Sequence, residues 1–251
     1  MKKLILILLL SMPGYLLASG GHVKLDKANI DPTNKPSLQR GLKYFANYCM
    51  GCHSLAFSRY NRVARDLGIP EDLVKENVIF TRDEKGEPTK IGALMKIAMP
   101  KLYAKQAFGK APPDLTLVGR ARGADWLYTY LRGFYLDPSR PFGVNNTVFP
   151  EVGMPHVLGE LQGYAAKEEA GHGEGHEAGG HEATKLKIVK PGSMTPAEYD
   201  RMVRDLVNFM AYVAEPGKQT RLSLGLPVLL FTLLFTILAY FMKKEFWKDV
   251  H

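Results

Sequence analysis

Cysteine is scarce in this chain: Cys49 and Cys52 are the two examples among 251 residues. Two thiols so close together cannot build a disulfide framework. Apart from His53, no further thiol or imidazole stands at ligand spacing around them, which argues against a structural zinc site. No strand–helix–strand pattern surrounds the pair, so a thioredoxin-like dithiol is also disfavoured. The apolar–polar alternation typical of strands is rare throughout the chain.

The two cysteines belong to Cys49-Met50-Gly51-Cys52-His53, a C-x-x-C-H pattern that indicates covalent attachment of haem c. On a helix, Cys49, Cys52 and His53 stand at positions i, i+3 and i+4, so all three project from one face. The two thiols can then form thioether bonds with the vinyl groups while the imidazole binds the iron. We therefore predict one covalent haem c held by Cys49, Cys52 and His53.

Apolar runs lie at both ends of the chain. Residues 1–20 have a basic start, an apolar run and a small-residue end, which is the pattern of a secretory signal peptide. Residues 222–242 are apolar and uncharged, and they are long enough to cross a bilayer as a helix. We expect residues 21–221 to lie outside the cytoplasm and the basic tail 243–251 to lie inside.

The formal net charge of +8 says little about the outer surface, because part of it belongs to the two ends. A nucleic-acid-binding surface is a poor interpretation of an exported, membrane-tethered chain. We expect no nucleic-acid partner.

Helical periodicity with long loops predicts an all-α domain followed by one transmembrane helix. Ser37 is the expected N-cap of the helix that carries the haem motif. Thr195-Pro196-Ala197-Glu198 combines a capping box with proline at the first helical position. The outer helices are expected at residues 37–50, 59–67, 91–99, 124–135 and 196–214.

The second axial ligand decides what a haem does, because methionine or histidine gives an electron carrier and an open position gives gas or peroxide chemistry. Met154 lies in a loop punctuated by proline and glycine, which can present a thioether without a helix. Met99 has a similar but weaker setting, and His156 is a rival nitrogen ligand. Spacing alone leaves these three open. The other outer methionines, which have no supporting context or fit a buried helix stripe, are Met95, Met194, Met202 and Met210.

Residues 167–183 are rich in glutamate, glycine and histidine. Such a composition cannot bury a core, and it predicts a solvated surface loop. Two sharper hypotheses are metal capture by the histidines and electrostatic attraction of a basic cytochrome c.

Together these features resemble the cytochrome c1 family, the haem subunits of quinol–cytochrome c oxidoreductases, in its proteobacterial form. The resemblance covers nearly the whole chain. A single anchor after a Glu-Pro element is far more specific than C-x-x-C-H alone. Besides the signal and the anchor, the matching segments are 48–54 (YCMGCHS), 111–116 (APPDLT), 153–155 (GMP) and 214–216 (AEP).

The resemblance implies a class I cytochrome c-like haem domain with long loops. In the family the two cysteines hold the haem, and a histidine and a methionine are its proximal and distal ligands. A proline-rich segment packs against the haem edge, and an arginine lies near the propionates. The matching positions are Cys49, Cys52, His53, Met154, Pro112 and Arg120. A solvated loop arginine is the alternative explanation of Arg120.

The resemblance also implies partners and a location. The partners would be a cytochrome b subunit, a Rieske iron–sulfur protein as electron donor and cytochrome c as acceptor, within a dimeric complex. The chain would cross a bacterial inner membrane once, with its haem domain in the periplasm, and would perform no substrate chemistry of its own. The alternatives are a stand-alone anchored monohaem cytochrome that feeds a terminal oxidase or reductase, and a haem enzyme or gas sensor.

Overall fold

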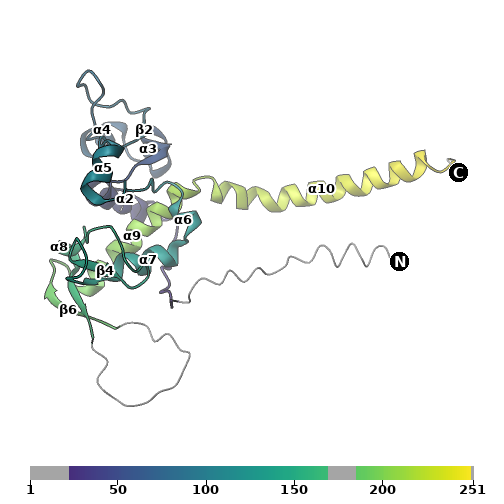
Figure 1. The fold of residues 1–251 in the computed structure, drawn as a ribbon. Helices are drawn as coiled ribbons and strands as arrows, with labels where there is room; N and C mark the ends of the chain where they lie inside the picture. The colour runs from purple at the N-terminus through teal and green to yellow at the C-terminus, as the bar shows by residue number, and fades with distance from the viewer. Residues whose placement is uncertain (1–22, 169–184, 250–251) are drawn as a thin grey trace, which may run out of the picture.

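The computed structural model describes residues 23–168 and 185–249. The predicted signal peptide (1–20) and nearly all of the segment 167–183 lie outside these residues, so their predictions stay untested. Helices dominate the described part of the chain, as predicted, and a long helix follows the outer domain (Figure 1).

The centre of the outer domain is formed by two helices that lie far apart in the sequence, α2 (Lys35–Tyr44) and α9 (Pro196–Ala214). Thr195 and Glu198 start α9 with the predicted capping box, and the backbone N–H of Thr195 donates to Glu198 Oε2 at 2.9 Å. The helix ends at Ala214, as predicted, directly before Glu-Pro-Gly. Its apolar face is buried against α2, where Phe45 and Phe209 pack with ring centroids 5.7 Å apart.

The helix that carries the haem motif begins earlier than predicted. Asn34, not Ser37, is the N-cap of α2, because its Oδ1 accepts from the backbone N–H of Ser37 at 3.1 Å. Ser37 lies inside the helix, where it is buried and donates to Asp205 at 2.6 Å. The helix then continues as a π-helical turn, η1 (Phe45–Cys49), which delivers the first motif cysteine. The prediction of Ser37 as the cap is therefore wrong.

Shorter helices surround this pair. In Figure 1, the helices α3, α4 and α5 lie in the upper group, α7 and α8 lie in the lower group, and α9 passes between the two groups. The predicted helix 59–67 is confirmed as α3, and the predicted helix 124–135 is confirmed but ends earlier as α7. The bounds are α3 (Tyr60–Leu67), α4 (Glu71–Asn77), α5 (Lys101–Phe108), α6 (Val118–Ala121), α7 (Ala124–Arg132) and α8 (Gly159–Gln162).

Within residues 23–168 and 185–249, three antiparallel strand pairs accompany the helices, and the sequence pattern did not predict them. The prediction of a helix over 91–99 is wrong, because this segment holds β2, whose Met95 pairs with Leu55 of β1. Gly92 and Pro100 also disfavour a helix there. The pairs are β1 (Leu55–Arg59) with β2 (Leu94–Met95), β3 (Phe134–Leu136) with β4 (Val144–Asn146), and β5 (Gly163–Lys167) with β6 (Leu186–Pro191).

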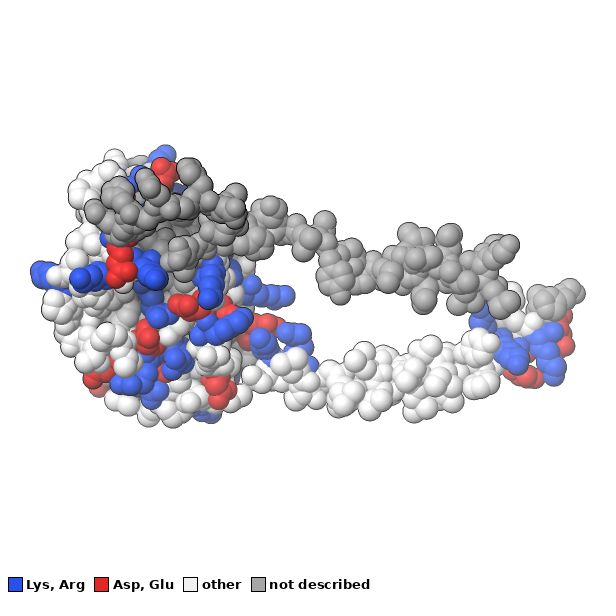
Figure 2. Space-filling view, turned by 90° about the horizontal axis from the view of Figure 1, so that it is seen from below, with Lys and Arg blue, Asp and Glu red and all other residues white. Residues whose placement is uncertain are grey.

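The final helix, α10 (Lys218–Phe246), extends away from the outer domain (Figure 1). Its 29 residues contain the predicted span 222–242 and would measure about 44 Å. None of its residues is buried within the described structure, and Figure 2 shows it white along its length with basic residues at both ends. This helix is long and apolar enough to cross a membrane.

Gly41 permits the close approach of α2 to α9. A Cβ at this position would lie 2.2 Å from the Asp205 carbonyl oxygen and 2.6 Å from Phe209 Cβ. We expect Gly41→Ala to lower the free energy of unfolding by about 1–3 kcal/mol, because backbone atoms of α9 cannot yield. This cost exceeds the helix-propensity gain of about 1 kcal/mol that alanine would otherwise bring.

Denaturant unfolding of the detergent-solubilised protein measures this change. Gly92→Ala is the matched control, since nothing lies within 4 Å of a Cβ built there. Equal stability of the Gly41→Ala variant and the unaltered protein would show that the two helices can separate without loss.

Candidate haem site

A cavity next to the C-x-x-C-H motif brings together four segments that are far apart in the sequence. About 810 Å³ of space in it is free of protein atoms, part of it open to solvent. Its walls come from the motif, from the end of α5 and the proline loop after it, from α7, and from the loop before α8. The lining residues are Tyr48, Cys49, Cys52, His53, Phe108, Lys110, Ala111, Pro112, Tyr130, Phe149, Val152, Gly153, Met154, Pro155 and Val157.

The motif forms the turn that the spacing predicts. The backbone N–H groups of Cys52 and His53 both donate to the Cys49 carbonyl, at 3.1 and 2.9 Å, so the helical turn carries all three side chains to one cavity. Burial raises the pKa of the Cys49 thiol to about 12. The described residues hold no cluster of three histidine, cysteine or acidic side chains able to bind a metal ion.

His53 is buried, and its Nδ1 lies 2.8 Å from the Pro113 carbonyl oxygen. A carbonyl can only accept, so Nδ1 carries the proton and the lone pair of Nε2 is free to bind a metal. Burial lowers the pKa of His53, which keeps the ring neutral at neutral pH. The imidazole thus has the tautomer and charge of an iron ligand.

Asp114 holds the proline loop that orients His53. Its two carboxylate oxygens accept from the backbone N–H groups of Ala56 at 2.7 Å and Thr116 at 2.9 Å. The loop is therefore tied to the strand that directly follows the haem motif. Pro112, predicted at the haem edge, does line the cavity.

Met154 lines the same cavity, and its Sδ accepts a hydrogen bond of 3.4 Å from the Tyr130 hydroxyl. The rival ligands do not reach this space. His156 stacks on Phe134 with ring centroids 4.8 Å apart and an interplanar angle of 6°, and Met99 is also absent from the lining. His156 Nε2 has no partner among the described residues, but burial lowers the pKa of this ring to about 4. Met95 and Met210, two of the methionines without support as haem ligands in the sequence, are buried in the hydrophobic core.

Two asparagines fix the loop that presents Met154. Asn146 Oδ1 accepts from the backbone N–H groups of Val148 at 2.9 Å and Phe149 at 3.2 Å. Asn145 Oδ1 accepts from the N–H of Glu151 at 2.9 Å. Glu151 itself has a φ of 60°, a conformation uncommon outside glycine, which sharpens the turn before the methionine. The predicted loop of fixed shape is therefore built by side-chain caps.

Other residues were missed or remain untested. Tyr130 was expected only as a residue of the predicted helix 124–135, and nothing in the sequence indicated a role for its hydroxyl. Lys110 lines the cavity and is exposed, which suits a group with acidic substituents at its rim. Arg120 is exposed on α6 and does not line the cavity, so its predicted place near the propionates stays a prediction.

The cavity fits haem c in the chemistry of its donors. Apolar and aromatic side chains form most of the wall, two thiols and a neutral imidazole come from one turn, and a thioether comes from a separate loop. When bound, haem would occupy a site that excludes most polar side chains.

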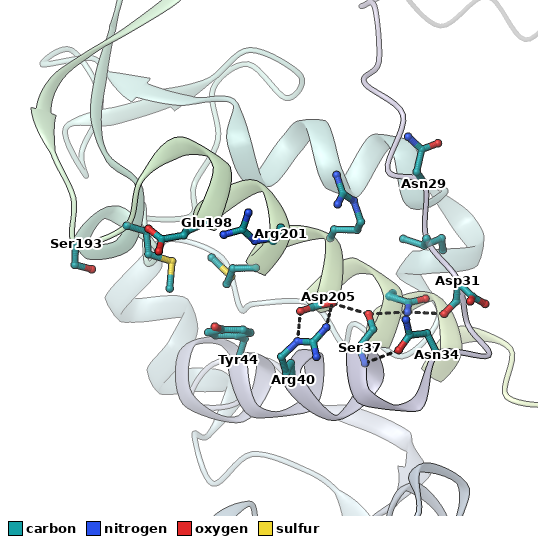
Figure 3. A pocket seen from close by; sticks show the side chains of 15 residues that line it. Asn29, Asp31, Asn34, Ser37, Arg40, Tyr44, Ser193, Glu198, Arg201 and Asp205 are labelled. Atoms are coloured by element: carbon teal, nitrogen blue, oxygen red, sulfur yellow. Dashed lines mark hydrogen bonds and ion pairs between the residues drawn. The ribbon is translucent and has the colours of Figure 1, made fainter.

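A larger cleft, with about 1230 Å³ of space free of protein atoms, lies elsewhere, between residues 29–34, α2 and α9 (Figure 3). Its polar groups largely satisfy one another: Arg40 Nε donates to Asp205 at 2.6 Å, and Asn208 Nδ2 donates to the Asp31 carbonyl at 2.7 Å. Met194 and Met202 line this cleft and not the haem site. No cysteine or histidine lines it, so it cannot hold a covalent haem.

Comparison with known proteins agrees with this site. The Cytochrome C1 family model matches residues 27–250. The chain is 53% identical to cytochrome c1 of Allochromatium vinosum, over the full length of both proteins. It is 47% identical to a protein of Nitrosomonas europaea named ammonia monooxygenase gamma subunit, over 100% of this chain and 99% of that protein. Identity to cytochrome c1 of Rhodospirillum rubrum is 29%, over 97% and 94% of the two chains.

The family match over nearly the whole chain thus agrees with three features of the structure, which are the motif turn, the cavity beside it and the apolar helix α10. This chain belongs to the cytochrome c1 family, and it is a membrane-anchored subunit of the cytochrome bc1 complex that carries covalently bound haem c.

Proposed function

We propose that Cys49 and Cys52 hold the haem through thioether bonds, with His53 as proximal and Met154 as distal ligand. The observation that carries this assignment is the cavity lining: among the described methionines and histidines, His53 and Met154 alone line it. One nitrogen and one sulfur ligand would leave no open position for gas or peroxide. The assignment therefore supports an electron carrier over a haem enzyme or sensor.

Haem c, when bound, supplies an iron centre that exchanges one electron. The thioether of Met154 favours the ferrous state, because soft sulfur donors raise the reduction potential. Buried apolar residues of the wall, such as Val152 at 4% exposure, disfavour the extra positive charge of the ferric state. The hydrogen bond between His53 Nδ1 and the Pro113 carbonyl holds this imidazole in place, so His53 would not need to move during electron transfer.

We further propose that the chain accepts electrons from the Rieske protein and passes them to cytochrome c. Its outer domain would lie in the periplasm, anchored by α10 in a bacterial inner membrane beside cytochrome b, in a dimeric complex. The signal-like residues 1–20 and the apolar helix α10 support this orientation. The basic residues 243–244 and 248 would then face the cytoplasm.

A redox difference spectrum of the protein, purified gently in detergent through a tag, tests the assembly. We expect a c-type band together with stoichiometric b-type haem. A c-type band alone, under conditions that keep a known bc1 complex intact, would favour the stand-alone cytochrome.

Replacement of Met154 tests the distal ligand. We expect Met154→Ala to lower the reduction potential by about 59 mV or more, a tenfold shift of a one-electron couple, and to open the haem to carbon monoxide. Redox titration and carbon monoxide difference spectra measure both effects. Met99→Ala is the control, since Met99 does not line the cavity. An unchanged ferric spectrum in Met154→Ala would remove Met154 as a ligand.

Replacement of Cys52 tests the covalent attachment. We expect Cys52→Ser to strongly reduce haem that survives denaturing electrophoresis, because serine cannot form a thioether and only the bond to Cys49 could then hold the haem. Haem staining of the purified protein measures this loss. Normal staining of the variant would contradict the assignment of the motif.

A further inference from the structure

Tyr130 places a hydroxyl group on the sulfur of Met154. The side chain leaves α7 toward the cavity, and its hydroxyl donates to Sδ at 3.4 Å. Thioethers are weak acceptors, so this hydrogen bond is a modest interaction. Its acceptor, however, is the sulfur atom that we propose as an iron ligand. Phenylalanine at position 130 would pack against the neighbouring rings equally well, so packing alone does not explain the hydroxyl.

Neighbouring rings fix the direction of this hydroxyl. Trp126 stacks on Tyr130 with centroids 4.9 Å apart and an interplanar angle of 10°. Phe134 meets it edge-on, with centroids 5.3 Å apart and an angle of 70°. The ring is thus held on two sides, which limits the hydroxyl to a small region of the cavity.

One side chain connects the donor to the loop of its acceptor. Asn146 Nδ2 donates to the Tyr130 carbonyl at 2.8 Å, while its Oδ1 holds the backbone N–H of Val148 and Phe149. The same amide group therefore sets the position of α7 relative to the loop that carries Met154. The bond between hydroxyl and sulfur lies within a framework that holds both partners.

We propose that Tyr130 is a positioning residue that tunes the haem potential through the Met154 sulfur; this inference rests on the ligand set proposed above. A hydrogen bond to the sulfur draws electron density away from the metal. The ferric state depends more on that density than the ferrous state does, so the hydroxyl raises the reduction potential. Nothing in this role requires Tyr130 to lose its proton or to touch the iron.

The size of the effect follows from the strength of the bond. Only the difference in hydrogen-bond strength between the two oxidation states shifts the potential, and a whole neutral hydrogen bond is worth at most about a tenfold shift of an equilibrium. For one electron a tenfold shift is about 59 mV, which sets the upper limit of the effect. The shift is measurable, and it is smaller than the loss of the ligand itself.

The test is Tyr130→Phe in the full-length, haem-loaded protein. We expect the reduction potential to fall within the limit above. The weak charge-transfer band of methionine-ligated ferric haem should remain, at a changed energy. Tyr212→Phe is the matched control, because it removes a buried hydroxyl that donates to Asp66 at 2.9 Å and does not line the haem cavity.

The outcomes separate this inference from the ligand assignment. An unaltered potential in Tyr130→Phe, or an equal fall in Tyr212→Phe, would overturn the tuning role. Loss of the band in Tyr130→Phe alone would also overturn it, because the hydroxyl would then be needed for ligation itself. Absence of the band from the unaltered protein would refute Met154 as ligand and with it the proposed function.

Discussion

The close packing of α2 against α9 is the contact on which the haem site depends. The haem motif follows α2 directly through η1, so the position of α2 sets the position of both cysteines and of His53. Gly41 lets the backbones approach, and Phe45 and Phe209 fill the contact on the motif side. Because these residues are buried, the motif turn is held by the core of the domain rather than by a surface loop. A helical scaffold of this kind gives covalent attachment a rigid base.

The other side of the site is built on a different principle. The loops that carry Pro113 and Met154 have little regular structure, and side-chain caps take the place of a backbone ladder. Asp114 accepts from one N–H of the first loop and from one N–H of β1, and Asn145 and Asn146 accept from three N–H groups of the second loop. Each cap leaves fewer free backbone groups near the cavity, so the wall facing the haem can remain mostly apolar. That apolar wall in turn favours the less charged ferrous state.

Sequence reasoning predicted well the features that short-range physics determines. The C-x-x-C-H turn, the capping box of α9 and the apolar span of α10 each follow from a few adjacent residues, and the structure confirms the turn and both helices. It failed where long-range pairing decides, as in segment 91–99, whose backbone pairs with a strand nearly forty residues earlier. Spacing alone could not choose between Met154, Met99 and His156, because that choice depends on which loop reaches the cavity, and only the family resemblance favoured Met154.

The hydroxyl of Tyr130, for which we propose a tuning role, shows why a polar group can escape sequence analysis altogether. Hydrophobic periodicity indicates on which face of a helix a ring lies, but not where its oxygen points. The same pattern would result from phenylalanine at this position. The polar atom becomes informative only when its acceptor is known, and here the acceptor comes from a loop 24 residues away. In a carrier that makes and breaks no substrate bonds, the protein acts through ligands, charges and hydrogen bonds around the metal. Such single contacts to a ligand atom are therefore where differences in potential between related haem domains should arise.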